Sequence, residues 1–253
     1  MDYLKDLNES QLLAVQTTEG AVRVVAGPGA GKTKALTSRY CYLVDAIGVA
    51  PGQILTSTFT NKAAKEMRRR VRDYLGDLDA GYICTFHSFC VQFLREEIHV
   101  LNFPQNYLIL DTEDQKQILN QIFADLNIGL RELTIKTALD KILEARKLNA
   151  VTYIDYFYQL DNEVIKKEFE MPSFRDDAIF LRYLYAQKKI YGCDFNDLIA
   201  FTVYILERFP DIRLKWQERL QYVMVDEFQD VSARQYQLAR LLAGHHGNIF
   251  IVG

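Results

Sequence analysis

Short apolar runs alternate with helical patterns in the first ninety residues. Runs rich in β-branched and apolar residues at 21–26, 53–59 and 82–85 have the length and composition of buried strands. Helical patterns follow the first two, from about Gly31 to Val44 and from about Asn61 to Leu75, and the third also leads into a helix. This alternation predicts a parallel sheet covered by helices on both faces.

The pattern changes between about residues 91 and 191. Apolar residues recur at helical spacing from Ile118 to Leu126, from Ile135 to Leu143 and from Ile179 to Leu184. Thr112-Glu-Asp-Gln115 fits a capping box at the start of the first of these helices. No part of this stretch has convincing strand composition, so the middle of the chain is predicted to be all-helical.

Strand composition returns after the helical middle. A helix is predicted from Asp194 to Pro210, and residues 222–225 and 248–252 have the composition of buried strands. One α/β domain interrupted by a helical insertion explains this order. We therefore divide the chain into residues 1–90 and 192–253, the two parts of the α/β domain, and residues 91–191, the inserted helical subdomain.

Composition narrows the class of protein. Of the 253 residues, 49% are hydrophobic and 25% are charged, as in ordinary soluble globular proteins. The amino terminus lacks a basic patch followed by an apolar run, and no stretch approaches the ~18 apolar residues of a membrane span. We expect a soluble cytoplasmic protein that does not associate with membranes.

The net charge of −3 gives no overall basic signature for nucleic acid. A local patch can still supply phosphate contacts, and basic residues crowd one predicted helix: Lys62, Lys65, Arg68, Arg69, Arg70 and Arg72. A solvated helix face explains the same run, and charge alone favours that alternative.

The cysteines do not form a recognisable metal motif. Cys84 and Cys90 flank His87, while Cys41 and Cys193 lie far away in the sequence. This spacing differs from that of a zinc pair, and no second pair completes four ligands. Reduced, mostly buried thiols are the better interpretation.

A glycine-rich segment, Ala26-Gly-Pro-Gly-Ala-Gly-Lys-Thr33, lies between a predicted strand and a predicted helix, which is the context that a P-loop requires. Its glycines let backbone N–H groups turn toward phosphates, and the helix amino terminus adds positive potential. Lys32 is expected to reach the β- and γ-phosphates of ATP, and Thr33 to ligate Mg²⁺. The nucleotide-binding residues are predicted to be Ala26, Gly27, Pro28, Gly29, Ala30, Gly31, Lys32 and Thr33.

Two acids end the predicted strand at residues 222–225. Asp226 is positioned beside the magnesium ion, as a Walker-B acid is. Glu227 can then accept a proton from the attacking water or orient that water. Alone, the pair would be an ordinary acidic strand end, but the upstream P-loop makes the nucleotide site the better interpretation.

The residues Asp226-Glu-Phe-Gln-Asp230 resemble the second helicase motif of the UvrD/Rep/PcrA group of superfamily 1 DNA helicases. Four other blocks are similar to motifs of that group and stand in the same order: Leu7-Asn-Glu-Ser-Gln11, Thr58-Phe-Thr-Asn-Lys-Ala-Ala64, Thr85-Phe-His-Ser88 and Asp194-Phe-Asn-Asp-Leu198. The resemblance covers residues 1–90 and 192–253, and we quote no motif for the helical middle.

The resemblance implies a RecA-like P-loop domain interrupted by the helical subdomain. It implies that Gln11 contacts the adenine edge of ATP, because its amide offers a donor and an acceptor together. It also implies that Lys32, Glu227 and Gln229 are catalytic. Lys34 is expected to contribute to nucleotide binding, but it stands where many relatives carry arginine. The lysine keeps the positive charge of that arginine but lacks its planar, forked guanidinium.

The same resemblance implies a set of DNA contacts. Phe59 and Phe195 are expected to stack on bases or to hold them in a pocket. Hydrogen bonds to the DNA backbone are expected from Thr60, Asn61, Thr85 and His87. Alone, each aromatic residue would more often belong to the core, and His87 would more often be structural.

The function implied is an ATP-dependent DNA helicase that moves 3′→5′ on single-stranded DNA, in DNA repair or replication. The expected partners are single-stranded DNA or a single-strand/duplex junction, and a second RecA-like domain of the same polypeptide. We expect the chain to be a monomeric, nearly inactive fragment, truncated at Gly253. Two alternatives are the ATPase part of a RecB/AddA-like helicase–nuclease, and a nucleotide-gated DNA-binding module without motor activity.

Overall fold

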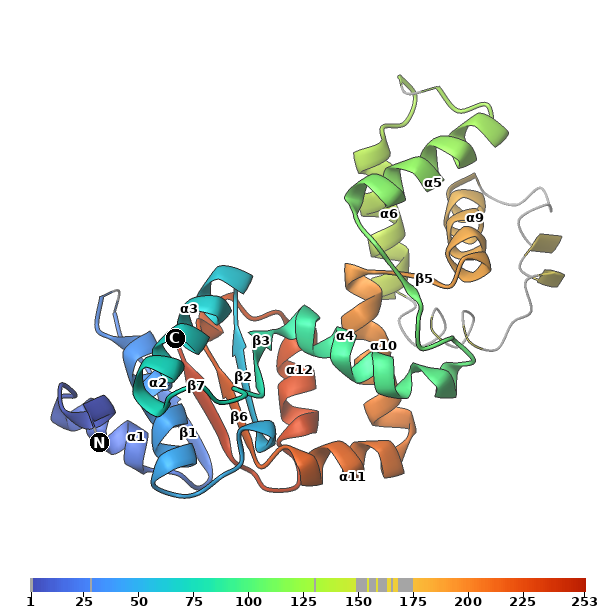
Figure 1. The fold of residues 1–253 in the computed structure, drawn as a ribbon. Helices are drawn as coiled ribbons and strands as arrows, with labels where there is room; N and C mark the ends of the chain where they lie inside the picture. The colour runs from blue at the N-terminus through green and yellow to red at the C-terminus, as the bar shows by residue number, and fades with distance from the viewer. Residues whose placement is uncertain are drawn as a thin grey trace. The chain divides into compact units, whose positions relative to one another are not determined.

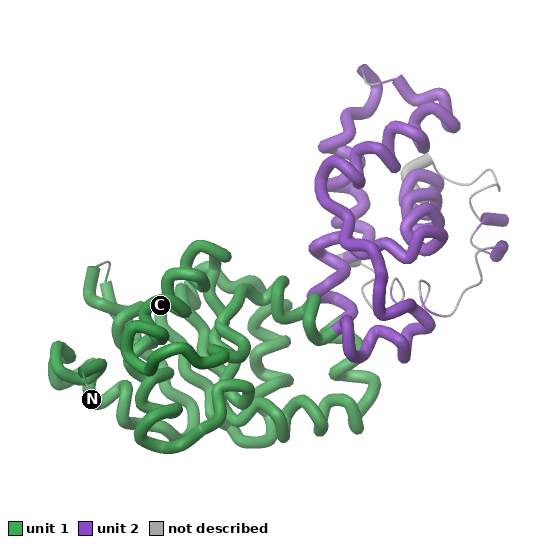
Figure 2. The backbone as a smooth tube through the Cα atoms, viewed as in Figure 1, with its two compact units in different colours: residues 1–93, 202–253 green, residues 94–201 purple. Residues whose placement is uncertain are grey.

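The computed structural model describes residues 2–27, 29–129, 131–148, 154, 158, 163–164, 166–167 and 175–253. These form two compact units, shown in green and purple in Figure 2. The first unit contains Met1–Phe93 and Thr202–Gly253, and the second contains Leu94–Phe201. The chain passes from one unit to the other within α4 (Phe86–Glu97) and again within α10 (Phe195–Arg208).

The first unit is built on a five-stranded sheet in the order β1-β7-β6-β2-β3. Every neighbouring pair of strands is parallel, which confirms the predicted parallel sheet. All five carboxyl ends therefore meet at one edge of the sheet. The strands are β1 (Ala21–Val24), β2 (Ile54–Thr58), β3 (Tyr82–Thr85), β6 (Tyr222–Val225) and β7 (Ile249–Val252).

Helices cover both faces of this sheet, as Figure 1 shows for α2 on one side and α12 on the other. Along β6, Met224 belongs to the core cluster that includes Leu36, while Val223 and Val225 on the opposite face are also fully buried. A strand buried on both faces explains the unbroken apolar composition of residues 222–225. The α-helices that lie wholly within this unit are α1 (Glu9–Gln16), α2 (Lys32–Asp45), α3 (Asn61–Leu75), α11 (Pro210–Arg219) and α12 (Ala233–Leu242).

Short 3-10 helices complete the connections: Asp2–Leu4, Pro51–Gln53, Ile98–Leu101 and Phe228–Asp230. The start of α3 agrees with the prediction, because the Thr60 hydroxyl accepts a hydrogen bond from the Ala63 N–H at 3.1 Å and so caps the helix. The first strand ends two residues earlier than predicted, at Val24. The Ala26 N–H nevertheless donates to the Gly253 carbonyl at 3.1 Å, which extends the pairing with β7.

The second unit packs α5 (Thr112–Asp125), α6 (Ile135–Leu148) and α9 (Arg175–Lys189) around buried residues such as Phe123 and Tyr183. The predicted capping box at Thr112 is wrong by one residue. Asp111 is the cap, and its carboxylate accepts from the N–H groups of Glu113 and Asp114 at 2.8 and 2.9 Å. A carboxylate that receives two N–H groups and faces the helix dipole is a stronger cap than a hydroxyl.

The prediction that the middle contains no strand is also wrong in one detail. Strand β4 (Leu108–Leu110) pairs in parallel with β5 (Gly192–Asp194), about eighty residues later in the sequence. Each strand has only three residues, too few to show a two-residue period. The close approach depends on Gly192, since a Cβ atom there would lie 2.8 Å from a methyl carbon of Leu110. Within the described part of the chain, no helix has the length and apolar character to cross a membrane.

Candidate ATP and DNA sites

The loop between β1 and α2 contains two glycines whose backbone angles suit a phosphate-binding turn. Gly29 and Gly31 have φ values of +76° and +78°, in the left-handed region that glycine tolerates. Gly31 occupies the cap position of α2 without a side-chain hydrogen bond to the first N–H groups. The N–H groups of the first turn of α2 are therefore available to bind an anion. The sequence also assigned Pro28 to this loop, but it lies outside the described residues.

Lys32 is the first residue of α2, and its ammonium group lies over the loop. Its Nζ donates to the Ala26 carbonyl at 3.3 Å and lies 3.6 Å from Oε2 of Glu227. Thr33 follows in the same helical turn, and its carbonyl accepts a hydrogen bond from the Thr37 hydroxyl at 2.8 Å. The fold therefore brings the glycine-rich loop to the acidic pair, nearly two hundred residues away in the sequence.

Asp226 is fixed at the carboxyl edge of the sheet by the backbone. Its N–H donates to the Ser57 carbonyl at 2.9 Å, which extends the β6–β2 pairing by one residue. The side chain is only 5% exposed. Burial raises the pKa of Asp226, and the neighbouring Glu227 carboxylate raises it further, while the Glu227 N–H and Lys32 lower it. A carboxylate in this position is stabilised by a nearby cation.

Glu227 has the unusual backbone angles φ 47° and ψ 50°. A residue other than glycine in this left-handed region costs roughly 1–3 kcal/mol, and such residues cluster at functional sites. The Oε2 atom of Glu227 faces Lys32 and accepts a hydrogen bond from Nε2 of Gln229 at 2.6 Å. The three residues that the sequence assigned to catalysis, Lys32, Glu227 and Gln229, thus form one chain of polar contacts.

Gln11 lies against the phosphate loop. Its Nε2 donates to the Ala30 carbonyl at 2.9 Å, and its Oε1 accepts from the Asn8 N–H at 3.0 Å. A Cβ atom on Gly31 would lie 2.7 Å from that Nε2, so a larger residue there would displace the amide. Both ends of the Gln11 amide are therefore bonded to the backbone, and an adenine base would have to replace these bonds.

Lys34 points toward the amino-terminal segment. Its Nζ donates to the Asp6 carbonyl at 2.7 Å and lies 3.9 Å from the Asp6 carboxylate. These contacts join the segment before α1 to α2. The structure thus places Lys34 beside the segment that leads into α1, the helix that carries Gln11, with its charge directed to Asp6.

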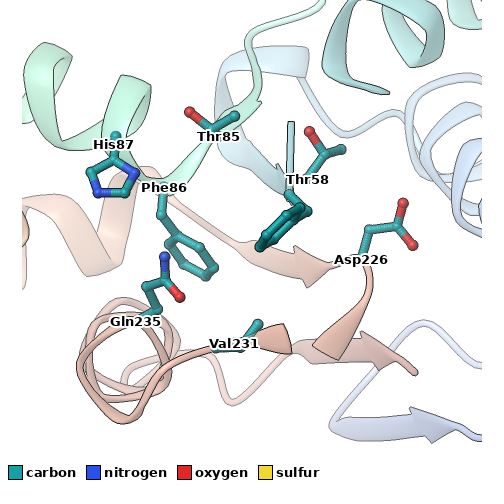
Figure 3. A pocket seen from close by; sticks show the side chains of 8 residues that line it. Thr58, Thr85, Phe86, His87, Asp226, Val231 and Gln235 are labelled. Carbon is teal, nitrogen blue, oxygen red and sulfur yellow. The ribbon is translucent and has the colours of Figure 1, made fainter. Parts of the chain in front are cut away.

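A pocket of about 180 Å³ lies next to the acidic pair, at the carboxyl ends of β2, β3 and β6. Figure 3 shows Phe86 and Gln235 on one side of this pocket and Asp226 on the other. The lining residues are Thr58, Phe59, Thr85, Phe86, His87, Asp226, Val231 and Gln235. Three of the predicted DNA-contacting residues, Phe59, Thr85 and His87, are thus brought together with Asp226, an acid that the sequence assigned to the nucleotide site.

Phe59 is 64% exposed, so its ring is accessible to a base at the rim of this pocket. Asn61 and Thr85 are joined through the Ser88 hydroxyl, which lies 3.5 Å from the Asn61 side-chain oxygen and 2.9 Å from the Thr85 hydroxyl. Burial lowers the pKa of His87, which favours the neutral imidazole. These polar groups and the amino terminus of α3 lie at the same sheet edge.

Sequence reasoning did not assign four of the lining residues: Thr58, Phe86, Val231 and Gln235. Thr58 and Phe86 stand inside motif blocks identified in the sequence, so their positions could have marked them. Val231 lies just before α12 and Gln235 lies in its first turn. Neither residue belongs to a motif found in the sequence. Phe195, the remaining DNA candidate, belongs to the second unit, where it is the first residue of α10 and 48% exposed.

The four cysteines are free and buried, which confirms the prediction of buried thiols. Burial raises the pKa of Cys84 and of Cys90 to about 12. On the basic helix α3, Glu66 forms ion pairs with Arg69 and Arg70. These exposed pairs support a solvated face for that part of the helix.

Comparisons with known proteins identify the family of this chain. Residues 7–253 match the model of the UvrD/REP helicase N-terminal domain. The chain belongs to the UvrD/REP helicase family. The N-terminal domain of this family is RecA-like, so the predicted family and fold class are both confirmed.

The relatives of this UvrD/REP family member include proteins named ATP-dependent DNA helicase PcrA. The identity is 37% over 254 residues with that of Bacillus subtilis (strain 168), and 34% over 257 residues with that of Staphylococcus aureus (strain NCTC 8325 / PS 47). It is 34% over 249 residues with that of Leuconostoc citreum. The matches cover 98–99% of this chain but 32–33% of each relative, so the chain spans about a third of their length.

The substitution Asp226→Asn tests the electrostatics of the acidic pair. The raised pKa of Asp226 means that its ionised form, present above that pKa, destabilises the cation-free fold. We expect Asp226→Asn to raise the melting temperature without divalent cation at neutral pH, and the difference to shrink as pH falls through the folded pKa. With Mg-ATP, wild type should gain stability and the variant should gain much less.

Thermal unfolding with and without Mg-ATP measures both effects. Asp211→Asn, which neutralises an exposed aspartate at the start of α11, is the matched control and should behave as wild type. An equal Mg-ATP stabilisation of wild type and Asp226→Asn would contradict the assignment of Asp226.

Proposed function

We propose that this chain is the first motor part of an ATP-dependent DNA helicase that couples Mg-ATP hydrolysis to 3′→5′ movement on single-stranded DNA. One observation carries the proposal. Asp226 lies beside the Lys32–Glu227 pair and also lines the pocket that contains Phe59 and Thr85. A nucleotide site and a DNA surface thus share a residue. The names of the relatives, which specify ATP and DNA, support the same pair of substrates.

We assign residues 1–90 and 192–253 to the ATPase domain and residues 91–191 to the inserted subdomain. Since the PcrA relatives are about three times as long as this chain, we propose that a second RecA-like domain of the same polypeptide completes the nucleotide site. In related phosphoryl transfers, an arginine supplied from outside the P-loop domain is worth about 10³–10⁵ in rate. This chain alone should therefore bind nucleotide weakly and hydrolyse it very slowly.

Triphosphate binding begins at the loop. The N–H groups around Gly29 and Gly31 and the first turn of α2 surround the phosphates, and Lys32 exchanges its contacts with Ala26 and Glu227 for phosphate oxygens. Gln11 contacts the adenine edge after its amide leaves the Ala30 carbonyl.

Thr33 and Asp226 are the residues that fit Mg²⁺. Both offer oxygen ligands, which Mg²⁺ prefers, and the Asp226 carboxylate is buried beside a second carboxylate, where a cation offsets their repulsion. When bound, Mg²⁺ neutralises charge that develops on the phosphate oxygens.

Glu227 then performs the proton transfer. The oxygen of a water molecule attacks the γ-phosphorus, the bond to the β-phosphate oxygen breaks, and the Glu227 carboxylate accepts the proton that the water loses. Gln229 holds that carboxylate through the 2.6 Å hydrogen bond to Oε2. The products are ADP and inorganic phosphate.

DNA binding uses the neighbouring pocket and its rim. Phe59 stacks on a base, while Thr60, Asn61, Thr85 and His87 bond the DNA backbone. The connection to the nucleotide is short, because the Ser57 carbonyl that accepts the Asp226 N–H lies only two residues before Phe59. A shift of Asp226 on hydrolysis would thus act directly on the end of β2.

The substitution Glu227→Gln tests the catalytic assignment. Removing the proton acceptor should lower kcat of the longer protein that contains this chain by about 10²–10⁴-fold, the usual worth of a general base. Nucleotide affinity should stay near that of wild type. Steady-state ATPase rates and nucleotide titrations measure the two quantities. Glu218→Gln, an exposed glutamate on α11, is the control. Wild-type turnover by Glu227→Gln would remove Glu227 from the mechanism.

The substitution Phe59→Ala tests the DNA surface. Losing one stacked base should weaken single-stranded DNA binding by about 5- to 100-fold, since base–aromatic stacking contributes about 1–3 kcal/mol. Fluorescence anisotropy with a labelled oligothymidylate gives the Kd. Tyr74→Ala, which removes another partly exposed aromatic ring near the end of α3, should change the Kd little. Equal effects of the two substitutions would contradict a specific role for Phe59.

A further inference from the structure

A buried group of charged and polar side chains lies in the second unit. Arg146, on α6, is 3% exposed. Its Nη1 donates to Oδ2 of Asp194 at 2.7 Å and lies 3.3 Å from Oδ1 of Asp197, and its Nη2 donates to Oε1 of Gln187 at 2.8 Å. The planar guanidinium thus spans three partners at once, which a lysine ammonium cannot do in the same way.

The two aspartates form a reciprocal cap at the start of α10. Oδ1 of Asp194 accepts from the N–H groups of Asn196 and Asp197 at 2.9 and 3.1 Å. Oδ2 of Asp197 accepts from the Asp194 N–H at 2.9 Å and from Nε2 of Gln187 at 2.8 Å. The first turn of α10 is therefore held by hydrogen bonds that converge on buried carboxylates.

Phe195 lies between these two aspartates, yet it is exposed. Its exposed fraction is 48%, whereas those of Asp194 and Asp197 are 3% and 0%. The buried cap fixes the backbone on both sides of Phe195, and with it the direction in which the ring leaves the helix. Arg146 places one positive charge within 3.3 Å of a carboxylate oxygen of each aspartate, which offsets their mutual repulsion in this buried place.

We propose that Arg146 is a positioning residue for DNA binding, which acts by holding the first turn of α10 so that the ring of Phe195 is presented to a base. This inference rests on the proposed function. Buried ion pairs contribute little net stability compared with apolar side chains of similar size. Their directional bonds do fix geometry, which is what an exposed, base-stacking ring requires.

A purely structural role for Arg146 would have a different signature. It would lower the stability of the second unit and weaken DNA binding independently of Phe195. A positioning role makes the effects of the two residues overlap, because a ring that is already removed cannot be misplaced. A double-mutant cycle separates these alternatives.

The cycle uses the longer protein that contains this chain, as wild type, Arg146→Met, Phe195→Ala and the double variant. The Kd for a labelled oligothymidylate, the melting curve and the affinity for ADP are measured for each. Arg146→Met and Phe195→Ala should each weaken DNA binding by a similar factor, about 5- to 100-fold. The double variant should be no weaker than Phe195→Ala, and ADP affinity should be unchanged. Arg131→Met, an exposed arginine in the same unit, is the control.

Several results would overturn the inference. One is wild-type DNA affinity in Arg146→Met. Another is a double variant whose fold-loss of DNA affinity is the product of the two single losses. The last is unchanged DNA affinity in Phe195→Ala while Phe59→Ala binds DNA poorly. The last result leaves the proposed function intact, whereas failure of wild type and all variants to bind DNA would refute the proposed function itself. If Arg146→Met does not fold, Arg146→Lys takes its place in the cycle. Unfolding of both would assign Arg146 to folding and reject the positioning role.

Discussion

The hydrogen bond from the Asp226 N–H to the Ser57 carbonyl is the contact on which the two sites depend. It carries the β6–β2 pairing one residue beyond the end of β6, so a buried carboxylate stands at the carboxyl edge of the sheet. Because the five strands are parallel, the phosphate loop after β1 opens at the same edge, and so does Phe59 after β2. Antiparallel pairing of β6 would have carried the acids to the opposite edge.

The ion pair between Lys32 and Glu227 is weak enough for a triphosphate to replace it. Lys32 and Glu227 lie 3.6 Å apart with side chains that are 14% and 37% exposed. Pairs as accessible as this one contribute about 0–1 kcal/mol, since water and salt screen them. Charge-assisted bonds from a lysine and a helix amino terminus to a triphosphate are stronger. Lys32 should therefore bind the phosphates instead of Glu227. Glu227 then keeps its hydrogen bond from Gln229.

The sequence predicted those parts of the fold that depend on neighbouring residues in the chain. Residues 222–225 were identifiable as a strand because burial on both faces demands unbroken apolar composition. The α3 start was identifiable because Thr60 caps it through a neighbouring N–H group. The phosphate loop was identifiable because backbone angles such as that of Gly31 require glycine. Asp226 and Glu227 were identifiable because they directly follow the buried strand at residues 222–225 and a P-loop lies upstream.

The remaining features depend on contacts between distant segments. Arg146 and Asp194 are 48 positions apart, and no local pattern marks an arginine that pairs with a helix cap in another segment. The β4–β5 pairing requires Gly192 to approach Leu110. Strands of three residues are too short for a sequence pattern to predict this pairing. Gln235, in the first turn of α12, lines the pocket together with Phe86, which lies about 150 residues earlier in the sequence.

The central claim is that one sheet edge couples ATP hydrolysis to DNA. The most direct measurement is the steady-state ATPase rate of the longer protein that contains this chain, with and without single-stranded DNA at saturating Mg-ATP. Coupling through Asp226 and the end of β2 predicts a rate that rises with DNA and saturates at its binding stoichiometry. An identical rate with and without DNA would contradict the account.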